Sequence, residues 1–179
     1  EALARLTAEG LTAPQGRRGV VVTDISLDHI HELFEVREAL DCQAAALAAE
    51  RRKDGVFEEL RVELAGADAL LDGGDPSRRR YFDLVSRMDA AIDEAAANQY
   101  LLQAQRNLRT HLVRVRRLAS DNPERLLAAA SEHALIAKAI ESRDAPLAIA
   151  ATRVHLNSSL EHVLSADEPG TIREEPIHG

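Results

Sequence analysis

Residues 30–44 read IHELFEVREALDCQA, and this stretch decides the fold that the sequence predicts. Its apolar side chains recur every three or four residues, the spacing that places them on one face of an α-helix. Arg37 and Asp41 fall on the same face, which runs from Ile30 to Ala44. Burying an ionisable side chain costs free energy unless another group pairs with it. This face therefore predicts a polar site enclosed in a helical core.

Three later stretches repeat this pattern of an ionisable residue within an apolar helical stripe. The ionisable residues are Asp89, His133 and His155. Their stripes comprise Phe82, Val85, Met88, Ile92 and Ala96 around Asp89; Leu126, Ala129, Ile136 and Ala137 around His133; and Ala148, Ala151 and Thr152 around His155. Four such stripes packed together would enclose a small polar site, which is the strongest indication of function in the sequence.

Residues that cap and break helices divide the later chain into about six helical segments. We predict helices over residues 27–52, 55–71, 76–96, 99–119, 123–142 and 145–165, with N-caps at Ser26, Asp54, Asp75, Asn98, Asn122 and Asp144. Side-chain oxygens at such positions accept hydrogen bonds from the first free backbone N–H groups of a helix. Because short turns join these segments, the predicted fold class is all-α, an antiparallel bundle.

The beginning of the chain has a different character. Residues 1–10 predict a short helix, and residues 11–14 and 19–23 predict the strands of a β-hairpin, with valines supplying the β-branched side chains. A helix that starts at residue 1 without a cap suggests that a preceding part of the protein is missing. We therefore predict a remnant of another domain over 1–25, a helical domain over 26–166 and a flexible tail over 167–179.

Composition narrows the classes of function. The net charge of −8 argues against most of this 179-residue chain being a nucleic-acid surface. The single cysteine, Cys42, and the lack of a long apolar run or a signal-peptide pattern favour the cytoplasm. We find no Ser/His/Asp or Cys/His signature of nucleophilic catalysis and no phosphate-binding glycine loop, so we do not expect an enzyme.

The N-terminal segments resemble part of a known family. Residues 1–11, EALARLTAEGL, and 16–22, GRRGVVV, are similar to the end of the recognition helix and the β-hairpin wing of a GntR-family winged helix. Residues 35–40, EVREAL, resemble the start of the FadR-like, FCD-type effector domain of that family. Further landmarks are Asn98–Leu101, Glu132 with His133, and Arg153–Leu156.

The resemblance implies a bacterial, ligand-responsive transcription regulator. Members of the family form homodimers, bind operator DNA through winged helices, and respond to a small metabolite that enters the helical domain. Arg17 and Arg18, at the tip of the predicted hairpin, would then contact DNA.

The resemblance also implies a metal site. Many effector domains of this kind hold a divalent metal with one Asp and three His. Counted back from Asn98, the Asp position of the family is Val85 here and the first His position is Asp89. The other two His positions match His133 and His155. Asp89, His133 and His155 would then hold one divalent ion such as Zn²⁺, Ni²⁺ or Mn²⁺.

Other interpretations of these residues remain open. In a metal-free pocket, Asp89 would pair with a protonated histidine or an arginine. Arg37 suits an effector carboxylate, because guanidinium donors match that group in a dry site, but it can also pair with Asp41 at i+4 within its own helix. His162 is a spare candidate on the His155 face.

The predicted effector-binding residues are Arg37, Asp89, His111, His133, Thr152, His155 and Ser159. Two alternatives compete with an effector domain: a metal-dependent helical-bundle enzyme, and a structural dimerisation module whose buried polar groups pair with one another.

Overall fold

Seven helices follow one another after residue 26 in the computed structural model, which describes residues 2–8, 12–16, 19–22, 27–53, 55–71, 77–119 and 122–166. They are α2 (Leu27–Arg51), α3 (Val56–Ala65), α4 (Asp68–Leu71), α5 (Arg79–Ala96), α6 (Gln99–Ala119), α7 (Pro123–Glu141) and α8 (Ala145–Ala166). The predicted all-α bundle is confirmed. None of these helices combines the length and apolar character that crossing a bilayer requires.

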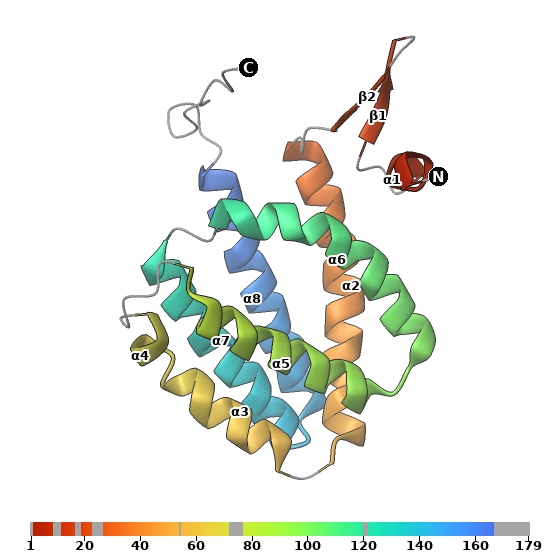
Figure 1. The fold of residues 1–179 in the computed structure, drawn as a ribbon. Coiled ribbons are helices and arrows are strands. Elements are labelled where there is room, and N and C mark those ends of the chain that lie inside the picture. The colour runs from red at the N-terminus through yellow and green to blue at the C-terminus, as the bar shows by residue number, and fades with distance from the viewer. Residues whose placement is uncertain are drawn as a thin grey trace.

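Before the bundle come α1 (Ala2–Ala8) and an antiparallel hairpin of β1 (Thr12–Gln15) and β2 (Gly19–Val22). Its register runs from Thr12 opposite Val22 to Gln15 opposite Gly19, which confirms the predicted hairpin. Figure 1 shows these elements beyond the end of the bundle at which α2 begins. Residues 17 and 18, the predicted DNA contacts, and the predicted tail after residue 166 lie outside the described residues, so these predictions stay untested.

Local side-chain caps start three of the helices where the sequence predicts them. The Asn98 carboxamide accepts hydrogen bonds from the backbone N–H groups of Tyr100 and Leu101, each at 3.1 Å. The Asn122 carboxamide accepts one from Arg125 at 3.1 Å, and the Asp144 carboxylate accepts one from the Leu147 N–H at 2.9 Å. The other predicted caps, Ser26, Asp54 and Asp75, lie outside the described residues.

The predicted helix over residues 55–71 is wrong in one respect, because it is two helices. The first ends at Ala65, and a turn at Gly66 and Ala67 precedes the four-residue α4. The Gly66 N–H donates to the carbonyls of Val62 and Glu63, both at 3.2 Å, which closes the last turn of α3. Glycine lowers helix propensity, and the turn buries Ala67 against Tyr81 and Leu126.

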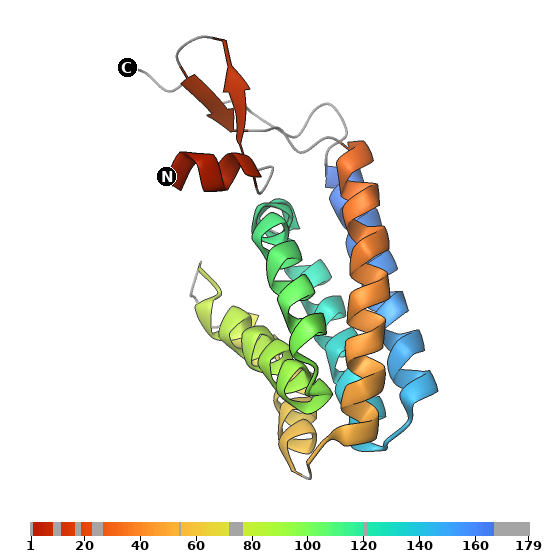
Figure 2. The same ribbon diagram turned by 90° about the vertical axis from the view of Figure 1, so that its right-hand side faces the viewer.

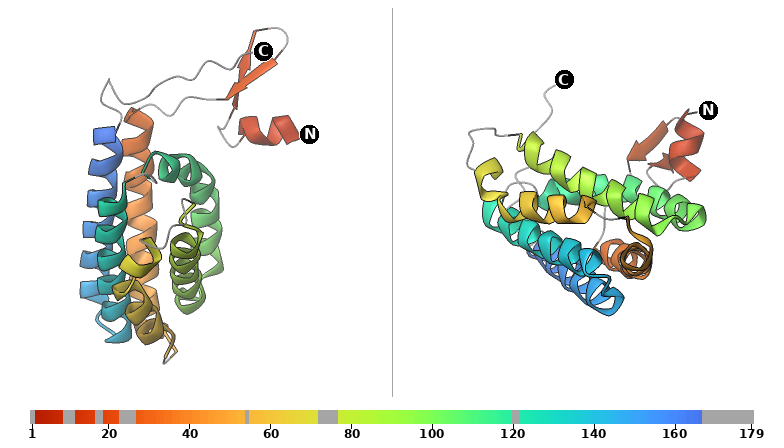
Figure 3. Two further views of the ribbon diagram at one scale, coloured as in Figure 1. Left: turned by 60° about the vertical axis from the view of Figure 1, so that its left-hand side comes forward. Right: turned by 90° about the horizontal axis from the view of Figure 1, so that it is seen from below.

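Small side chains allow the helices of the bundle to pack close together. Helices α2, α7 and α8 run alongside one another, as Figures 1 and 2 show, and α8 packs against both α2 and α7. Helix α3 packs on α7, α5 packs on α2, and α6 packs on α2 and α8 (Figure 3). The shared core includes the buried alanines Ala45, Ala48, Ala49, Ala137, Ala139, Ala148 and Ala151.

Two arginines fix one end of the bundle through helix carbonyls. Arg52 Nε donates to the Ile140 carbonyl at 2.8 Å, and its Nη2 donates to the Glu141 carbonyl. In return, Arg143 Nη1 donates to the Glu50 carbonyl at 3.3 Å. Arginines just beyond α2 and α7 therefore provide hydrogen-bond donors for free carbonyl groups at the C-terminal ends of these helices. The cavity described below lies toward the middle of the bundle and its other end.

Candidate functional site

A cavity of about 200 Å³ lies between α2, α5, α6, α7 and α8. Its polar lining comes from Arg37, Asp41, Ser86, Asp89, Gln105, Arg109, Arg125, His133, Thr152, His155, Ser159 and His162. Apolar side chains, including Phe34, Val85, Met88, Leu112 and Ile136, form the rest of the wall. The predicted polar site within the helical core is therefore present, and every predicted effector-binding residue except His111 lines it.

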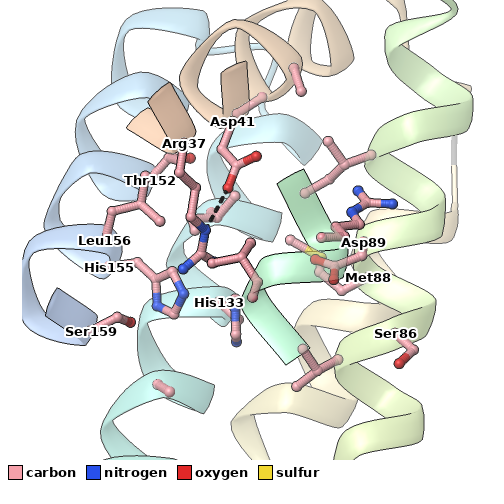
Figure 4. Close-up of a pocket in the computed structure, with 18 of the residues that line it drawn as sticks. Arg37, Asp41, Ser86, Met88, Asp89, His133, Thr152, His155, Leu156 and Ser159 are labelled. Atoms are coloured by element: carbon pink, nitrogen blue, oxygen red, sulfur yellow. Dashed lines mark hydrogen bonds and ion pairs between the residues drawn. The ribbon is translucent and has the colours of Figure 1, made fainter. Parts of the chain in front are cut away.

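Arg37 enters the cavity from α2 and is held in place on its own helix. Its side chain is only 11% exposed, and its Nε donates to Asp41 Oδ2 at 3.1 Å. Gln105, on α6, donates to the other oxygen of Asp41 at 2.9 Å. In Figure 4 the far end of the guanidinium extends from Asp41 toward His133 and His155. The intrahelical pair is therefore present and orients a residue that lines the cavity, and the binding of an effector carboxylate by Arg37 stays a prediction.

His133 and His155 form an imidazole pair below Arg37 (Figure 4). Their ring centroids lie 4.3 Å apart, with the planes tilted by 42°. Burial lowers the pKa of His155 below its ordinary value, the hydrogen bond to Glu132 partly offsets this, and the positive charge of Arg37 lowers it further. His155 is therefore neutral at neutral pH.

Glu132 is the centre of a buried network behind His155. It contacts the Nδ1 of His155 at 2.7 Å and receives both terminal nitrogens of Arg125 at 2.9 Å. Arg125 also donates to the hydroxyl of Ser159 at 3.0 Å. Burial raises the pKa of Glu132, but hydrogen bonds from His155 and Arg125 outweigh it and hold that pKa below its usual value. The network therefore contains an ionised carboxylate and fixes three side chains of the cavity wall.

The roles of Glu132 and Arg125 were not predicted from the sequence. The available signal was their spacing of seven residues, two helical turns, which places opposite charges on one face of α7. From the sequence, Glu132 is only a family landmark beside His133. Its contacts with α8 could not be predicted, because they depend on how the helices pack.

Asp89 lies across the cavity from the imidazoles, on α5 (Figure 4). Close to it, Arg109 of α6 makes a bidentate pair with Asp93 of α5, at 2.7 and 2.9 Å. Burial lowers the pKa of Arg109, but the hydrogen bond to Asp93 and the charges of Asp89 and Asp41 more than offset this. The opposite wall is thus an arginine between carboxylates, a different electrostatic environment from that around His155.

The three predicted metal ligands do not come together as a ligand set. Across the described residues, no group of three or more His, Cys, Asp and Glu side chains is placed to hold a metal ion. Val85 lines the cavity at the position where the resemblance implies Asp, so its side chain supplies methyl groups there instead of a carboxylate. In this structure the donors do not fit a metal, and metal binding by Asp89, His133 and His155 stays a prediction.

The remaining predicted residues differ in their placement. Thr152 is buried in the cavity wall, and its hydroxyl has no hydrogen-bond partner among the described residues, a state that costs about 1–3 kcal/mol. His111 does not line the cavity, because at about 100° per residue it points to the flank of the face that carries Leu108 and Leu112. His162 lines the cavity, and burial and then the charge of Arg125 lower its pKa.

Comparison with known proteins gives one family match and one informative structural likeness. The family model of the FCD domain matches residues 32–158. The structure of E. coli McbR/YncC is similar with a TM-score of 0.67 at 18% identity, and the alignment covers 92% of this chain and 77% of that chain. No curated protein matches the sequence.

Proposed function

We propose, on the premise that the chain belongs to the FCD-domain family, that it is part of a transcription regulator of the GntR type. Its helical domain binds a small carboxylate metabolite that controls operator DNA binding. The cavity between the five helices is the proposed effector site. The assignment of the chain to the FadR-like subgroup stays a prediction.

The observation that carries this proposal is the placement of Arg37. A largely buried guanidinium forms short, charge-assisted hydrogen bonds to a carboxylate, often in a bidentate arrangement. The contacts of Asp41 with Arg37 and Gln105 hold the side chain in one orientation before a ligand arrives. Such preorganisation lowers the entropic cost of binding.

The size and lining of the cavity favour a compact acid. About 200 Å³ is too small for a long acyl chain, and hydroxyl, imidazole and guanidinium groups share the wall with apolar side chains. Such a mixture of apolar surface and a few convergent polar groups is typical of small-molecule sites.

Regulation would follow from a difference in affinity. If the acid binds one arrangement of a homodimer more tightly than another, it shifts the population toward that arrangement, and operator affinity changes by the coupling free energy. Arg17 and Arg18 are the proposed DNA contacts from this chain, and the proposed place of action is the cytoplasm.

A thermal-shift screen of mono-, di-, hydroxy- and amino-carboxylates, followed by calorimetry, tests this proposal. We expect at least one compact acid to bind, and the Arg37→Gln variant to bind it about 10–100-fold more weakly, a loss of about 1.4–2.8 kcal/mol. Arg153→Gln is the matched control, because Arg153 pairs with Glu38 between α2 and α8 but outside this cavity. Equal affinity in the two variants, or no binding of any acid, contradicts the proposal.

The metal prediction is tested in the same assay. Because Arg37 supplies the charge in this proposal, we expect EDTA to leave the affinity for the acid unchanged. Loss of binding on chelation, with recovery on adding Zn²⁺, Ni²⁺ or Mn²⁺, would instead support the metal site at Asp89, His133 and His155 that the family resemblance implies.

A further inference from the structure

We propose that the effector is a carboxylate with a compact apolar group, such as a branched alkyl chain or an aromatic ring, and that Val85 is a residue that selects it. The proposal rests on the proposed function for the carboxylate that contacts Arg37. Its part about an apolar wall of the cavity concerns the free protein and is tested separately.

The two sides of the cavity differ in chemical character. Arg37, Thr152 and His155 lie on one side, and Figure 4 shows Met88 of α5 on the other. Val85 precedes Met88 by three residues on the same helix, so both belong to the face of α5 that lines the cavity. An acid whose carboxylate contacts Arg37 therefore directs its other end toward α5.

Apolar side chains from three helices line the cavity in fixed positions. They are Val85 and Met88 of α5, Leu112 of α6 and Ile136 of α7, and each is between 1% and 8% exposed. Met88 and Ile136 are part of the main core, and Val85 is part of a second core cluster. Because packing behind the wall holds these side chains, the apolar surface is present before a ligand binds.

The polar side chains near this wall already interact with other groups of the protein. The Ser86 hydroxyl donates to the Phe82 carbonyl at 2.8 Å, and Arg109 makes its bidentate pair with Asp93. The charge of Asp89 lies close enough to Arg109 to stabilise the guanidinium. A ligand therefore gains more on this side from apolar contact than from new hydrogen bonds.

Water is a poor occupant of the space beside the apolar wall. A water molecule inside a protein needs about two to four polar partners, whereas this wall presents methyl and methylene groups. Each methylene of a ligand that is buried there should raise the affinity about fourfold. A ligand hydroxyl in the same place would lose its hydrogen bonds to water without replacement. The cavity should therefore prefer an apolar acid over a hydroxylated acid of similar shape.

Met88 provides a direct probe of the free cavity, because it is the single methionine of the chain. Wild-type protein with ¹³C-labelled methionine and valine methyl groups is titrated with benzene, an apolar probe without a carboxylate, and followed by NMR. We expect the Met88 methyl resonance to shift in a saturable manner, while those of Val62, exposed on α3, stay unchanged. An unchanged Met88 resonance, or equal changes at both residues, overturns the proposal.

Calorimetry with isovalerate and 3-hydroxybutyrate tests the selectivity, because these acids have similar shapes and differ by a methyl group in place of a hydroxyl. Wild-type protein should bind isovalerate at least about tenfold more tightly. Threonine has nearly the shape of valine but carries a hydroxyl, so Val85→Thr should reduce this preference to less than about threefold. The matched control Val62→Thr, outside the cavity, should keep it.

The outcomes separate the two claims. If benzene shifts Met88 but no acid binds, the proposed function fails and the apolar wall stands. If another acid binds but isovalerate does not, if isovalerate binds no more tightly than 3-hydroxybutyrate, or if Val85→Thr keeps the preference, the inference fails and the proposed function stands. The benzene titration and the comparison of the two acids use wild-type protein, so they decide the matter even if Val85→Thr does not fold.

Discussion

Single residues in this cavity are fixed by three arginine–carboxylate contacts. Arg37 contacts Asp41 within α2, Arg125 contacts Glu132 within α7, and Arg109 contacts Asp93 between α6 and α5. These pairs are partly buried, so removing one partner leaves the other charge less well compensated. Each pair therefore holds a charged side chain at the wall of the cavity.

A pH dependence of stability follows from His155. Its pKa in the folded protein is below the ordinary value of 6.5, so below that pH the unfolded chain binds more protons than the folded chain. The contribution of His155 to the free energy of unfolding should therefore be at its maximum above about pH 7. It should fall as the pH drops through the unfolded pKa of about 6.5. Chemical denaturation between pH 7.5 and 5.5 measures it.

The substitution His155→Asn should reduce the change in the free energy of unfolding between pH 7.5 and 5.5. The substitution His31→Asn, at an exposed residue of α2, should not. The lowered pKa of His162 contributes with the same sign, so some slope should remain in the first variant. Glu132 acts at lower pH, because its pKa is below the ordinary 4.5. A stability that rises on acidification from pH 7.5 to 5.5 contradicts the burial of a neutral His155.

The residues that sequence could assign are those whose partners are local. The Arg37–Asp41 pair at i+4 and the caps at Asn98, Asn122 and Asp144 follow from spacing along one helix. The contact of Glu132 with His155 joins two helices, and no spacing reveals it. The unsatisfied hydroxyl of Thr152 likewise depends on the full packing around it.

At the scale of elements, the junction of α5 and α6 is strained. Ala97, the C-cap of α5, has φ 47° and ψ 44°, the left-handed conformation that costs a residue with a Cβ about 1–2 kcal/mol. Ala97→Gly should therefore raise the free energy of unfolding by roughly 1 kcal/mol, since glycine adopts this conformation without strain but gains entropy in the unfolded chain. Urea denaturation at constant pH measures the change.

Ala90→Gly gives the matched control, because Ala90 is an exposed residue inside α5 with ordinary helical geometry. It should lower the free energy of unfolding by about 1 kcal/mol, the usual cost of glycine inside a helix. The same sign of change in both variants would contradict the left-handed assignment at Ala97.

Element boundaries were the least predictable feature of the fold. The apolar pattern of residues 55–71 continues across Gly66, and one glycine costs a helix only about 1 kcal/mol. Burial of Ala67 decides in favour of a break, and burial is a property of the assembled bundle. Sequence pattern therefore predicted that the segment is helical but not that it is two helices.

At the scale of the whole molecule, α6 is the cavity wall best placed to respond to a ligand. It contributes Gln105, Leu108, Arg109 and Leu112 to the lining and is tied to its neighbours through Gln105–Asp41 and Arg109–Asp93. At the other end of the bundle, the Arg52 and Arg143 contacts fix α2 to α7. A bound acid would therefore stabilise α6 more than the alanine-rich core.

Hydrogen exchange with and without a saturating acid tests this expectation. At 100 times the dissociation constant a ligand stabilises the folded state by about 2.7 kcal/mol, so amides that exchange through opening of the cavity should slow by up to about 100-fold. We expect this protection over residues 99–112 of α6. Helix α3, which contributes no described residue to the cavity lining, should change less. Equal protection of both helices, or none in α6, contradicts the assignment of α6 as the responsive wall.

The fold class and the polar core were predictable because both depend on helical periodicity, which the sequence states directly. Stripes that carry Arg37, Asp89, His133 and His155 do line one cavity. Their arrangement within the cavity was not predictable, because it depends on how the helices pack, and the packing puts Asp89 across the cavity from the imidazoles.

The most direct test of the central claim is where an acid binds. We would titrate the tightest-binding acid of the panel into the protein and follow the histidine ring resonances by NMR. We expect the resonances of His133 and His155 to shift until the site is saturated, and those of His29 and His31, exposed on α2, to stay unchanged. Shifts confined to His29 and His31, or saturable binding that leaves His133 and His155 unchanged, would contradict an effector site in this cavity.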